Sequence, residues 1–190
     1  MFIQNQVYLY NMSAVYQPGE DSRLLLKNAE PRMRGAVLDI GTGSGLLAVE
    51  AAQNPDVTRV VAVDINSEAV KATMKRADDG GVVVDVRHGD LFEPVKGELF
   101  DLILFNSPYL PSEGEADEPS WAGGQRGDEV ITRFLDEAYH HLNPGGIVLM
   151  IYSTHSNLEL EKWDTIYCIE VLEELAIFYE RLFCVLLRPR

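Results

Sequence analysis

Residues 37–45 read Val37-Leu-Asp-Ile-Gly41-Thr-Gly43-Ser-Gly45, and this stretch decides the fold that the sequence predicts. The apolar run from Gly35 to Ile40 is typical of a strand that is buried on both faces. The glycines that follow are typical of a tight turn, and the residues from about Leu46 to Gln53 predict a helix. A strand, a glycine turn and a helix in this order predict an α/β fold in which helices cover a mostly parallel sheet.

The rest of the chain continues this alternation. Further strands are expected at residues 59–63, 81–86, 100–105 and 146–151, and helices at residues 23–28, 67–77 and 128–142. Ser67 is expected to cap the helix that begins there. Beyond Tyr152, apolar stretches at residues 166–172 and 181–188 predict an antiparallel hairpin that completes a seven-stranded, Rossmann-like sheet with helices on both faces. Residues 173–180 fit a strand and a helix equally well.

Length and composition indicate one soluble domain, residues 1–190, in the cytoplasm. Apolar residues make up 46% and charged residues 24% of the chain, as in globular proteins. The sequence shows no signal peptide and no apolar run of roughly 20 residues, so no membrane span is expected. The formal charge of −14 disfavours direct binding of nucleic acid. Cys168 and Cys184 lie in apolar contexts without zinc-like spacing, so we expect two buried, reduced thiols and no metal site.

Three short segments are expected to meet around one cofactor. In the glycine turn, Gly41 and Gly43 let a ligand approach the backbone, and the helix that follows offers free N–H groups. Asp39 would repel a pyrophosphate, but it suits a cofactor whose amino-acid end carries an ammonium group. Tight packing between strand and helix is the alternative explanation of the glycines.

The other two segments carry carboxylates. Asp64, followed by Ile65, ends the second strand 23 positions beyond Gly41, where it can accept both hydroxyls of a ribose. Asp90 follows the third strand and can accept a hydrogen bond from an adenine amine, while Leu91 packs on the ring. Taken singly, Asp64 also fits a helix cap and Asp90 a turn residue.

In this order the three segments resemble those of the class I S-adenosylmethionine-dependent methyltransferases, over residues 35 to about 152. The resemblance implies that S-adenosylmethionine is the cofactor. It also implies that the last strands pair as a hairpin, in agreement with the apolar pattern.

The fourth strand ends in Phe105-Asn106-Ser107-Pro108-Tyr109, at the position where α/β sheets bind substrates. An amide or aromatic amine is a poor nucleophile because its lone pair is delocalised. The oxygen of Asn106 and a backbone carbonyl beside Ser107 can accept both N–H hydrogens, Tyr109 offers a flat face, and Pro108 stiffens the turn. The segment resembles the Asn-Pro-Pro-Tyr motif of N-methyltransferases, from which it departs at Ser107. A plain Asn-x-Pro turn is the alternative.

Two further segments narrow the substrate. Residues 15–26 and 120–127, read together with the segment after the fourth strand, resemble the archaeal and eukaryotic HemK-related protein-glutamine methyltransferases. The resemblance implies N5-methylation of the glutamine in the Gly-Gly-Gln motif of the class 1 translation termination (release) factor. It also implies that residues 1–34 contact the cofactor through Glu20, Asp21 and Ser22, and that residues 110–127 form an active-site loop. Ser22 also fits a helix cap.

The same resemblance implies a partner, a small zinc-binding activator subunit that pairs with an edge strand. The third strand, Val82–Val86, is expected to be that edge. Three consecutive valines on an open edge would favour association unless they are covered. A helix of this chain that covers them is the alternative.

Two other functions remain open at the level of sequence. A tRNA or rRNA base N-methyltransferase has the same core, and a basic face near Asn106 would favour it, but only Arg126 and Arg133 are candidates for such a face. A catalytically silent scaffold that binds S-adenosylmethionine is the third possibility, and the intact Asn106 argues against it.

Overall fold

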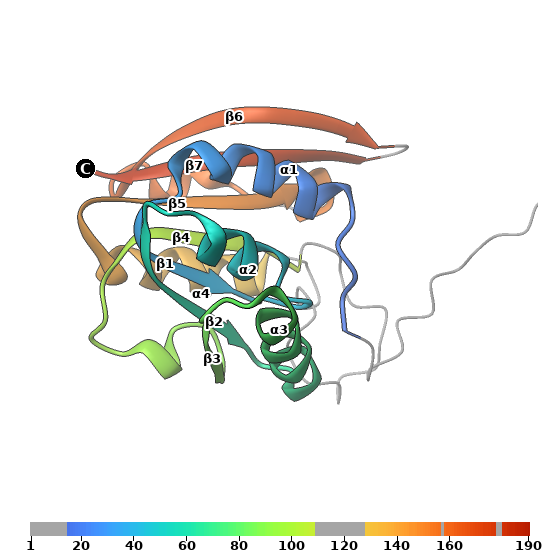
Figure 1. Ribbon diagram of the computed structural model, residues 1–190. Helices are drawn as coiled ribbons and strands as arrows, with labels where there is room; N and C mark the ends of the chain where they lie inside the picture. Colours follow the sequence, from blue (N-terminus) through green and yellow to red (C-terminus); the bar gives the residue numbers. More distant parts are fainter. Residues whose placement is uncertain (1–14, 109–127, 157, 178–179) are drawn as a thin grey trace, which may run out of the picture.

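The computed structural model describes residues 15–108, 128–156, 158–177 and 180–190, which form one twisted sheet with helices on both faces (Figure 1). The strands are β1 (Gly35–Ile40), β2 (Val57–Asp64), β3 (Asp85–His88), β4 (Phe100–Asn106), β5 (Leu142–Ser153), β6 (Tyr167–Ile177) and β7 (Glu180–Pro189). The α-helices are α1 (Glu20–Ala29), α2 (Leu46–Gln53), α3 (Ser67–Gly80) and α4 (Glu129–Ala138). Short 3-10 helices are η1 (Glu30–Arg32), η2 (Glu93–Val95), η3 (Tyr139–His141), η4 (Thr154–Ser156) and η5 (Leu160–Trp163).

The seven strands lie in the order β3-β2-β1-β4-β5-β7-β6, which confirms the predicted fold class. Strands β1 to β5 are parallel, and β7 runs antiparallel to both of its neighbours. The pairing of β6 with β7 extends to Ile177, so residues 173–177, which the sequence left undecided, are strand. A register irregularity lies between Val171 and Glu173.

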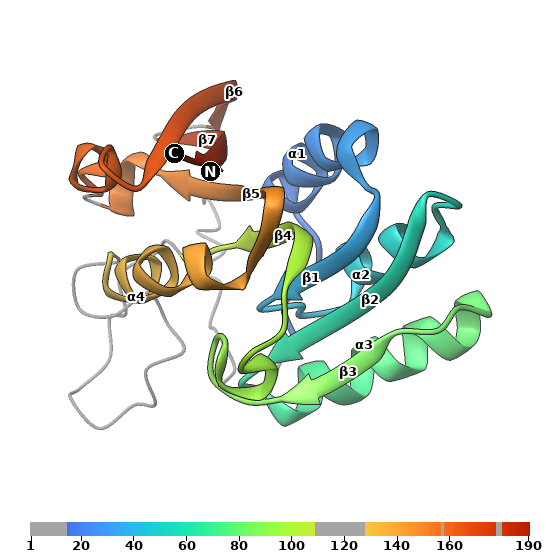
Figure 2. The ribbon, with the colours of Figure 1, turned by 90° about the vertical axis from the view of Figure 1, so that its left-hand side faces the viewer.

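Two apolar layers hold the helices on the sheet, because successive side chains of a strand point to opposite faces. On one face Leu38 of β1 belongs to the same buried cluster as Phe134 of α4. On the other face Val37 joins Leu25 of α1 and Leu47 of α2. Figure 2 shows α4 on one side of the sheet and the other three helices on the opposite side. Within the described ranges, no helix is both long and apolar enough to cross a membrane.

The third strand begins later than the sequence predicted. β3 is only Asp85–His88, so residues 82–84 precede it. The reason lies at the end of α3. The helix runs to Gly80, and Gly81 follows it in the left-handed conformation with a φ of +65°. The N–H groups of Gly81 and Val82 donate to the carbonyls of Asp78 and Ala77 in the last turn of the helix. Because of this helix cap, the strand begins further along the chain. Val83 is left 91% exposed.

Two smaller predictions were wrong, as was the alternative role of Ser22 as a helix cap. Asn66, not Ser67, caps α3, because its side-chain oxygen accepts the N–H of Glu68 at 2.9 Å. Ser22 does not cap α1, since it lies inside the helix as its third residue. Cys168 is exposed, whereas Cys184 is buried as expected.

Candidate active site

The carboxyl ends of four parallel strands meet at one edge of the sheet. Ile40 at the end of β1 lies beside Val63 of β2 and Phe105 of β4. Asp64 in turn lies beside His88 of β3. The turns that follow these strands are therefore neighbours, at the position where open α/β sheets bind their ligands.

The glycine turn after β1 folds back onto β2. The N–H of Gly41 donates to the carbonyl of Val63 at 2.8 Å. Gly45, at the start of α2, has a φ of +77°, and a Cβ there would lie 2.9 Å from the Cα of Thr73 in α3. Packing therefore explains Gly45. At Gly41 the nearest atom to an added Cβ would be a ring carbon of Phe105 at 3.9 Å, so the left-handed backbone (φ +66°), and not packing, favours a glycine there.

Asp39 lies next to this turn and is 1% exposed. The hydroxyl of Thr42 donates to its Oδ2 at 2.7 Å, and its Oδ1 has no hydrogen-bond partner in the part of the chain that the structure describes. Burial, together with the charge of nearby Asp64, raises the pKa of Asp39 to about 7. A cation at the free oxygen would stabilise the charged carboxylate.

Asp64 ends β2 and is held through both oxygens. Its Oδ2 accepts the N–H of Gly43 and its Oδ1 accepts the N–H of Asn66, both at 2.8 Å. The side chain is thus fixed, and each oxygen keeps a second lone pair for a hydroxyl. Burial raises the pKa of Asp64. Ile65, which follows, is half-buried, and its carbonyl lies 2.9 Å from Nε2 of His88.

The turn after β3 carries Asp90 and Leu91. The N–H of Gly89 donates to the backbone carbonyl of Asp64 at 3.0 Å, so this turn lies beside the end of β2. Asp90 accepts from Nη2 of Arg133 in α4 at 2.5 Å. Leu91 is 7% exposed and adopts a φ of +47°, which is uncommon for a residue with a side chain.

The ion pair between Asp90 and Arg133 argues against a basic face near Asn106. Arg133 is one of the two arginines that would have favoured an RNA substrate, and part of its charge is compensated by Asp90. The other, Arg126, lies outside the described residues.

The segment before β1 lies against the glycine turn. A Cβ at Gly43 would lie 3.7 Å from the carbonyl oxygen of Tyr16. In the first turn of α1, Asp21 and Ser22 are 4% and 5% exposed. Glu20 differs, because its side chain is 60% exposed and forms an ion pair with Arg23. The described contacts therefore join Asp21 and Ser22, but not Glu20, to the other predicted residues.

Asn106 closes β4 and contacts α1. Its Nδ2 donates to Oδ2 of Asp21 at 3.3 Å and to Oγ of Ser22 at 3.2 Å. Its Oδ1 is buried and has no hydrogen-bond partner among the described residues. Ser107 donates its hydroxyl to the carbonyl of Ile151 in β5 at 2.5 Å, a bond that fastens the turn where a proline would otherwise stiffen it.

Two other residues were predicted in the turn after β4, Pro108 and Tyr109, and the structure describes only the first. Pro108 is half-buried. Tyr109 and the expected active-site loop, residues 110–127, lie outside the described residues.

Taken together, the polar side chains of the site are mainly hydrogen-bond acceptors. Carboxylates of Asp21, Asp39, Asp64 and Asp90 lie around the strand ends, beside the free oxygen of Asn106. Such a set fits a ligand with an ammonium group, hydroxyls and an aromatic amine, and it would repel a phosphate.

Sequence reasoning missed two contacts in this set. The hydroxyl of Tyr16 lies 2.7 Å from each carboxylate oxygen of Asp21, and no spacing rule links those positions. The second contact is the hydrogen bond from Thr42 to Asp39. It could have been predicted, because a hydroxyl residue inside the turn lies only three positions from the buried carboxylate.

A cavity of about 360 Å³ lies at the opposite end of the strands from the candidate active site, where the parallel strands begin. It is lined by Arg32, Arg34, Gly145, Gly146, Ile147, Leu186, Arg188 and Pro189. None of the predicted site residues lines it, so it is separate from the candidate active site.

Comparison with known proteins gives consistent matches. Residues 9–166 match the family described as Methyltransferase small domain. A putative protein N5-glutamine methyltransferase of Methanocaldococcus jannaschii is 40% identical over 145 residues, 74% of this chain and 73% of that protein. A release factor glutamine methyltransferase of Koribacter versatilis is 38% identical over 66% of this chain, which spans about half (49%) of that protein.

Among solved structures, a chain of the E. cuniculi Mtq2–Trm112 complex has a TM-score of 0.73 and 25% identity. The match covers 93% of this chain and 99% of that chain. That complex is responsible for the methylation of the eRF1 translation termination factor.

Proposed function

Because the chain belongs to the methyltransferase small domain family, we propose that it transfers the methyl group of S-adenosylmethionine to the side-chain nitrogen N5 of a glutamine. The substrate that we propose is the glutamine of the Gly-Gly-Gln motif in the class 1 translation termination factor. Relatives named for glutamine methylation, one of them 40% identical, support this choice, as does the eRF1-methylating complex of E. cuniculi. A termination factor acts on ribosomes, so we place the activity in the cytoplasm.

The free oxygen of Asn106 is the observation that carries the proposal. It is a buried acceptor without a partner among the described residues, at the end of a strand whose neighbours carry the other site residues. An amide nitrogen is a weak nucleophile, so the protein must hold it at the methyl group and accept its N–H hydrogens. Asn106 Oδ1 accepts one hydrogen in this proposal, and the backbone carbonyl beside Ser107 accepts the other. The increase in the rate of methyl transfer comes from positioning and the exclusion of water more than from proton transfer.

The residues that would hold S-adenosylmethionine follow from the acceptor set. When bound, this cofactor supplies an electrophilic methyl group on a sulfonium. In our proposal Asp39 and Ser22 receive its amino-acid end, and Asp64 receives its ribose. The other proposed contacts come from the backbone at Gly41 and Gly43, from Ile65, Asp90 and Leu91 around the adenine, and from Glu20 and Asn106.

We further propose that the partner is a small zinc-binding activator that docks on the β3 edge of the sheet. β3 pairs only with β2 among the described strands, so its other edge offers backbone hydrogen-bonding groups. The exposed Val83 lies beside this edge. The E. cuniculi relative was solved together with Trm112, which supports a partner subunit for this chain.

The test uses the purified chain, with and without the co-expressed partner, and a labelled cofactor. Substrates are the termination factor, a matched factor with the Gly-Gly-Gln glutamine replaced by alanine, and bulk tRNA and rRNA. We expect label only in the first of these. Label in RNA, or equal label in both factors, would contradict the substrate that we propose.

The Asn106→Ala variant tests the role of the acceptor. Its turnover should fall by roughly 10²-fold or more, because the amide is no longer held in line with the methyl group. Cofactor affinity should stay within a few-fold of wild type, since the lost interaction is made to the substrate. A variant that keeps a tenth of the wild-type turnover would show that Asn106 does not align the amide.

A further inference from the structure

The direction of the Asn106 amide is set by α1, and from this contact we propose that Asp21 is a positioning residue. Asp21 holds the NH2 of Asn106 away from the substrate and thereby points the oxygen toward it. This inference rests on the proposed function, because an oxygen in that direction is what an N–H substrate requires. It adds a role for a residue 85 positions away in the chain.

The chemistry of the contact fixes which end of the amide faces α1. A carboxylate accepts hydrogen bonds and cannot donate them, so the Asn106 atom 3.3 Å from Asp21 Oδ2 must be the nitrogen. The second contact agrees. Ser22 lies with its hydroxyl 3.3 Å from Asp21 Oδ1, to which it can donate, which leaves its oxygen to accept from Asn106 at 3.2 Å. Both hydrogens of the NH2 are then used, and only the oxygen is left for a ligand.

Asp21 is itself held in one orientation. Its Oδ1 accepts the backbone N–H of Ser22 at 2.6 Å, and the hydroxyl of Tyr16 lies 2.7 Å from each oxygen. The side chain is 4% exposed, so water does not compete for these bonds. Oδ2 is therefore the oxygen that faces Asn106.

This arrangement predicts that Asp21→Asn turns the side-chain amide of Asn106 around, so that its NH2 group and not its oxygen faces the substrate. The N–H of Ser22 keeps an oxygen at the Oδ1 position, so the new NH2 group occupies the place of Oδ2. Two NH2 groups would then face each other, and Asn106 would rotate so that its oxygen turns to position 21. A substrate N–H would meet a donor, and kcat at saturating cofactor should fall by roughly 10²-fold, as for other losses of a positioned group.

A reciprocal exchange separates this role from simple damage. In the double variant Asp21→Asn/Asn106→Asp, the new amide at position 21 donates to one oxygen of the new carboxylate at position 106. The other oxygen faces the substrate again. We expect kcat of the double variant to exceed that of each single variant by at least about tenfold, since Asn106→Asp alone opposes two carboxylates. Glu30→Gln, which removes an exposed carboxylate at the other end of α1, is the control and should match wild type. If the double variant is no more active than the poorer single variant, Asp21 has no positioning role.

A second readout does not depend on methyl transfer. In protein labelled with ¹⁵N-asparagine, the side-chain NH2 signals of Asn106 are identified by their loss in Asn106→Asp. Hydrogen exchange of this NH2 should be slow in wild type, where both hydrogens are bonded in a buried site, and at least about tenfold faster in Asp21→Asn. Fast exchange in wild type would overturn the inference even if the variant fails to fold. Slow exchange in a protein that methylates no glutamine would refute the proposed function and leave the orientation of the amide intact.

Discussion

At the residue scale, Asp39 is a buried carboxyl whose proton would compete with a bound cation. Its pKa is raised to about 7, so below that pH the cofactor-free protein keeps the proton. An ammonium group at the free Oδ1 favours the charged carboxylate, so binding of S-adenosylmethionine should release the proton. Cofactor affinity should therefore rise roughly tenfold between about pH 5.5 and pH 7, and then level off. Calorimetry in buffers of different ionisation enthalpy measures both the affinity and the released proton.

Asp39→Asn is the matched control for this prediction. Its amide can still accept from Thr42 but does not titrate, so its weaker affinity should change less with pH than that of wild type. Stability gives a second check. Because the folded pKa is raised, wild type loses stability as the pH rises from about 4 to about 7, and the variant should lose less, since only Asp64 still has a raised pKa there. Equal pH dependence in the two proteins would remove Asp39 from the cofactor site.

Asp64→Ala should weaken the binding of S-adenosylmethionine more than tenfold. Two charge-assisted hydrogen bonds to the ribose, at about 1.5–3 kcal/mol each, would be lost. Asp56→Ala, an exposed carboxylate just before β2, is the control and should bind normally. An unchanged Kd for Asp64→Ala would show that this carboxylate does not hold the ribose.

The site residues differ in how far the chain order predicts them. Gly41, Asp64 and Asp90 each lie at or just after the carboxyl end of a strand. The carboxyl ends of neighbouring parallel strands lie together, so the proximity of these residues could be predicted. The contact of Asn106 with Asp21 depends on how α1 packs on the sheet, and no local pattern contains that information. Glu20 is exposed, unlike its two buried neighbours in α1, and the order of residues along the chain does not predict that difference.

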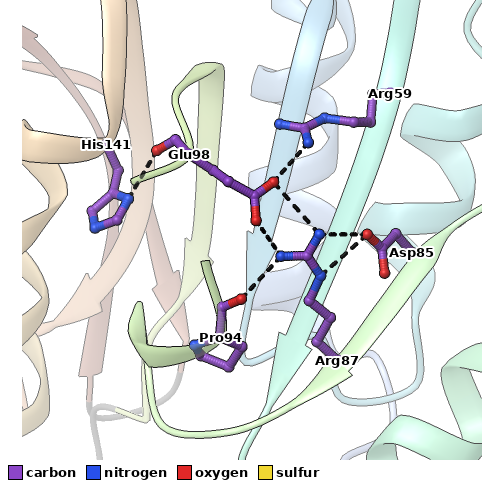
Figure 3. Close-up of polar contacts among 6 residues, drawn as sticks. All are labelled: Arg59, Asp85, Arg87, Pro94, Glu98 and His141. Atoms are coloured by element: carbon purple, nitrogen blue, oxygen red, sulfur yellow. Dashed lines mark hydrogen bonds and ion pairs between the residues drawn. The ribbon is translucent and has the colours of Figure 1, made fainter. Parts of the chain in front are cut away.

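At the element scale, the short strand β3 is tied to the sheet by an ion-pair network (Figure 3). Arg87 of β3 binds Asp85, the carbonyl of Pro94, and Glu98, which precedes β4. Glu98 also pairs with Arg59 of β2 at 2.7 Å. These side chains connect an edge strand of four residues to β2 and to the segment that precedes β4. Arg87, together with Arg59, lowers the pKa of Glu98.

Glu98→Gln should loosen β3 more than it destabilises the whole protein. A partly exposed network of this kind is worth about 1 kcal/mol, so the global loss should be small. Hydrogen exchange of the Val86, Arg87 and His88 amides should nevertheless become several-fold faster. Since the folded pKa of Glu98 is lowered, the advantage of wild type is present at neutral pH and disappears as the pH falls below about 4. Glu93→Gln, an exposed carboxylate in η2, is the control, and equal exchange in the two variants would contradict the role of the network.

The error in the third strand has a physical cause at the same scale. Val82, Val83 and Val84 have high strand propensity, and that propensity predicted a strand from residue 81. The left-handed cap at Gly81 keeps the chain in the end of α3, so the strand starts only at Asp85. Local propensity cannot show where a helix ends, because the cap depends on backbone hydrogen bonds.

At the scale of the whole molecule, the fold could be predicted almost completely. Continuous apolar runs separated by helices specify a parallel sheet, and the order of the strands follows from the methyltransferase resemblance rather than from any single run. The hairpin at one edge was predicted as well, but the sequence pattern did not show how short the strand at the other edge is. The two edges differ, since β6 is an eleven-residue strand of a hairpin, whereas β3 is short and follows an exposed valine.

This difference predicts which edge binds the activator. A partner strand that pairs with β3 would extend the sheet and could recruit residues 82–84 into the pairing, because their backbone is not in a strand without it. Val83→Lys should then weaken the complex at least about tenfold by placing a charge in the contact, without affecting cofactor binding by the isolated chain. Val171→Lys, at a valine on β6 that is 55% exposed, should leave the complex intact. Hydrogen exchange supplies the direct test: the amides of residues 83–88 should gain protection when the partner is added, and those of β6 should not. Protection that appears on β6 instead, or an effect of Val171→Lys as large as that of Val83→Lys, would place the partner on the other edge of the sheet.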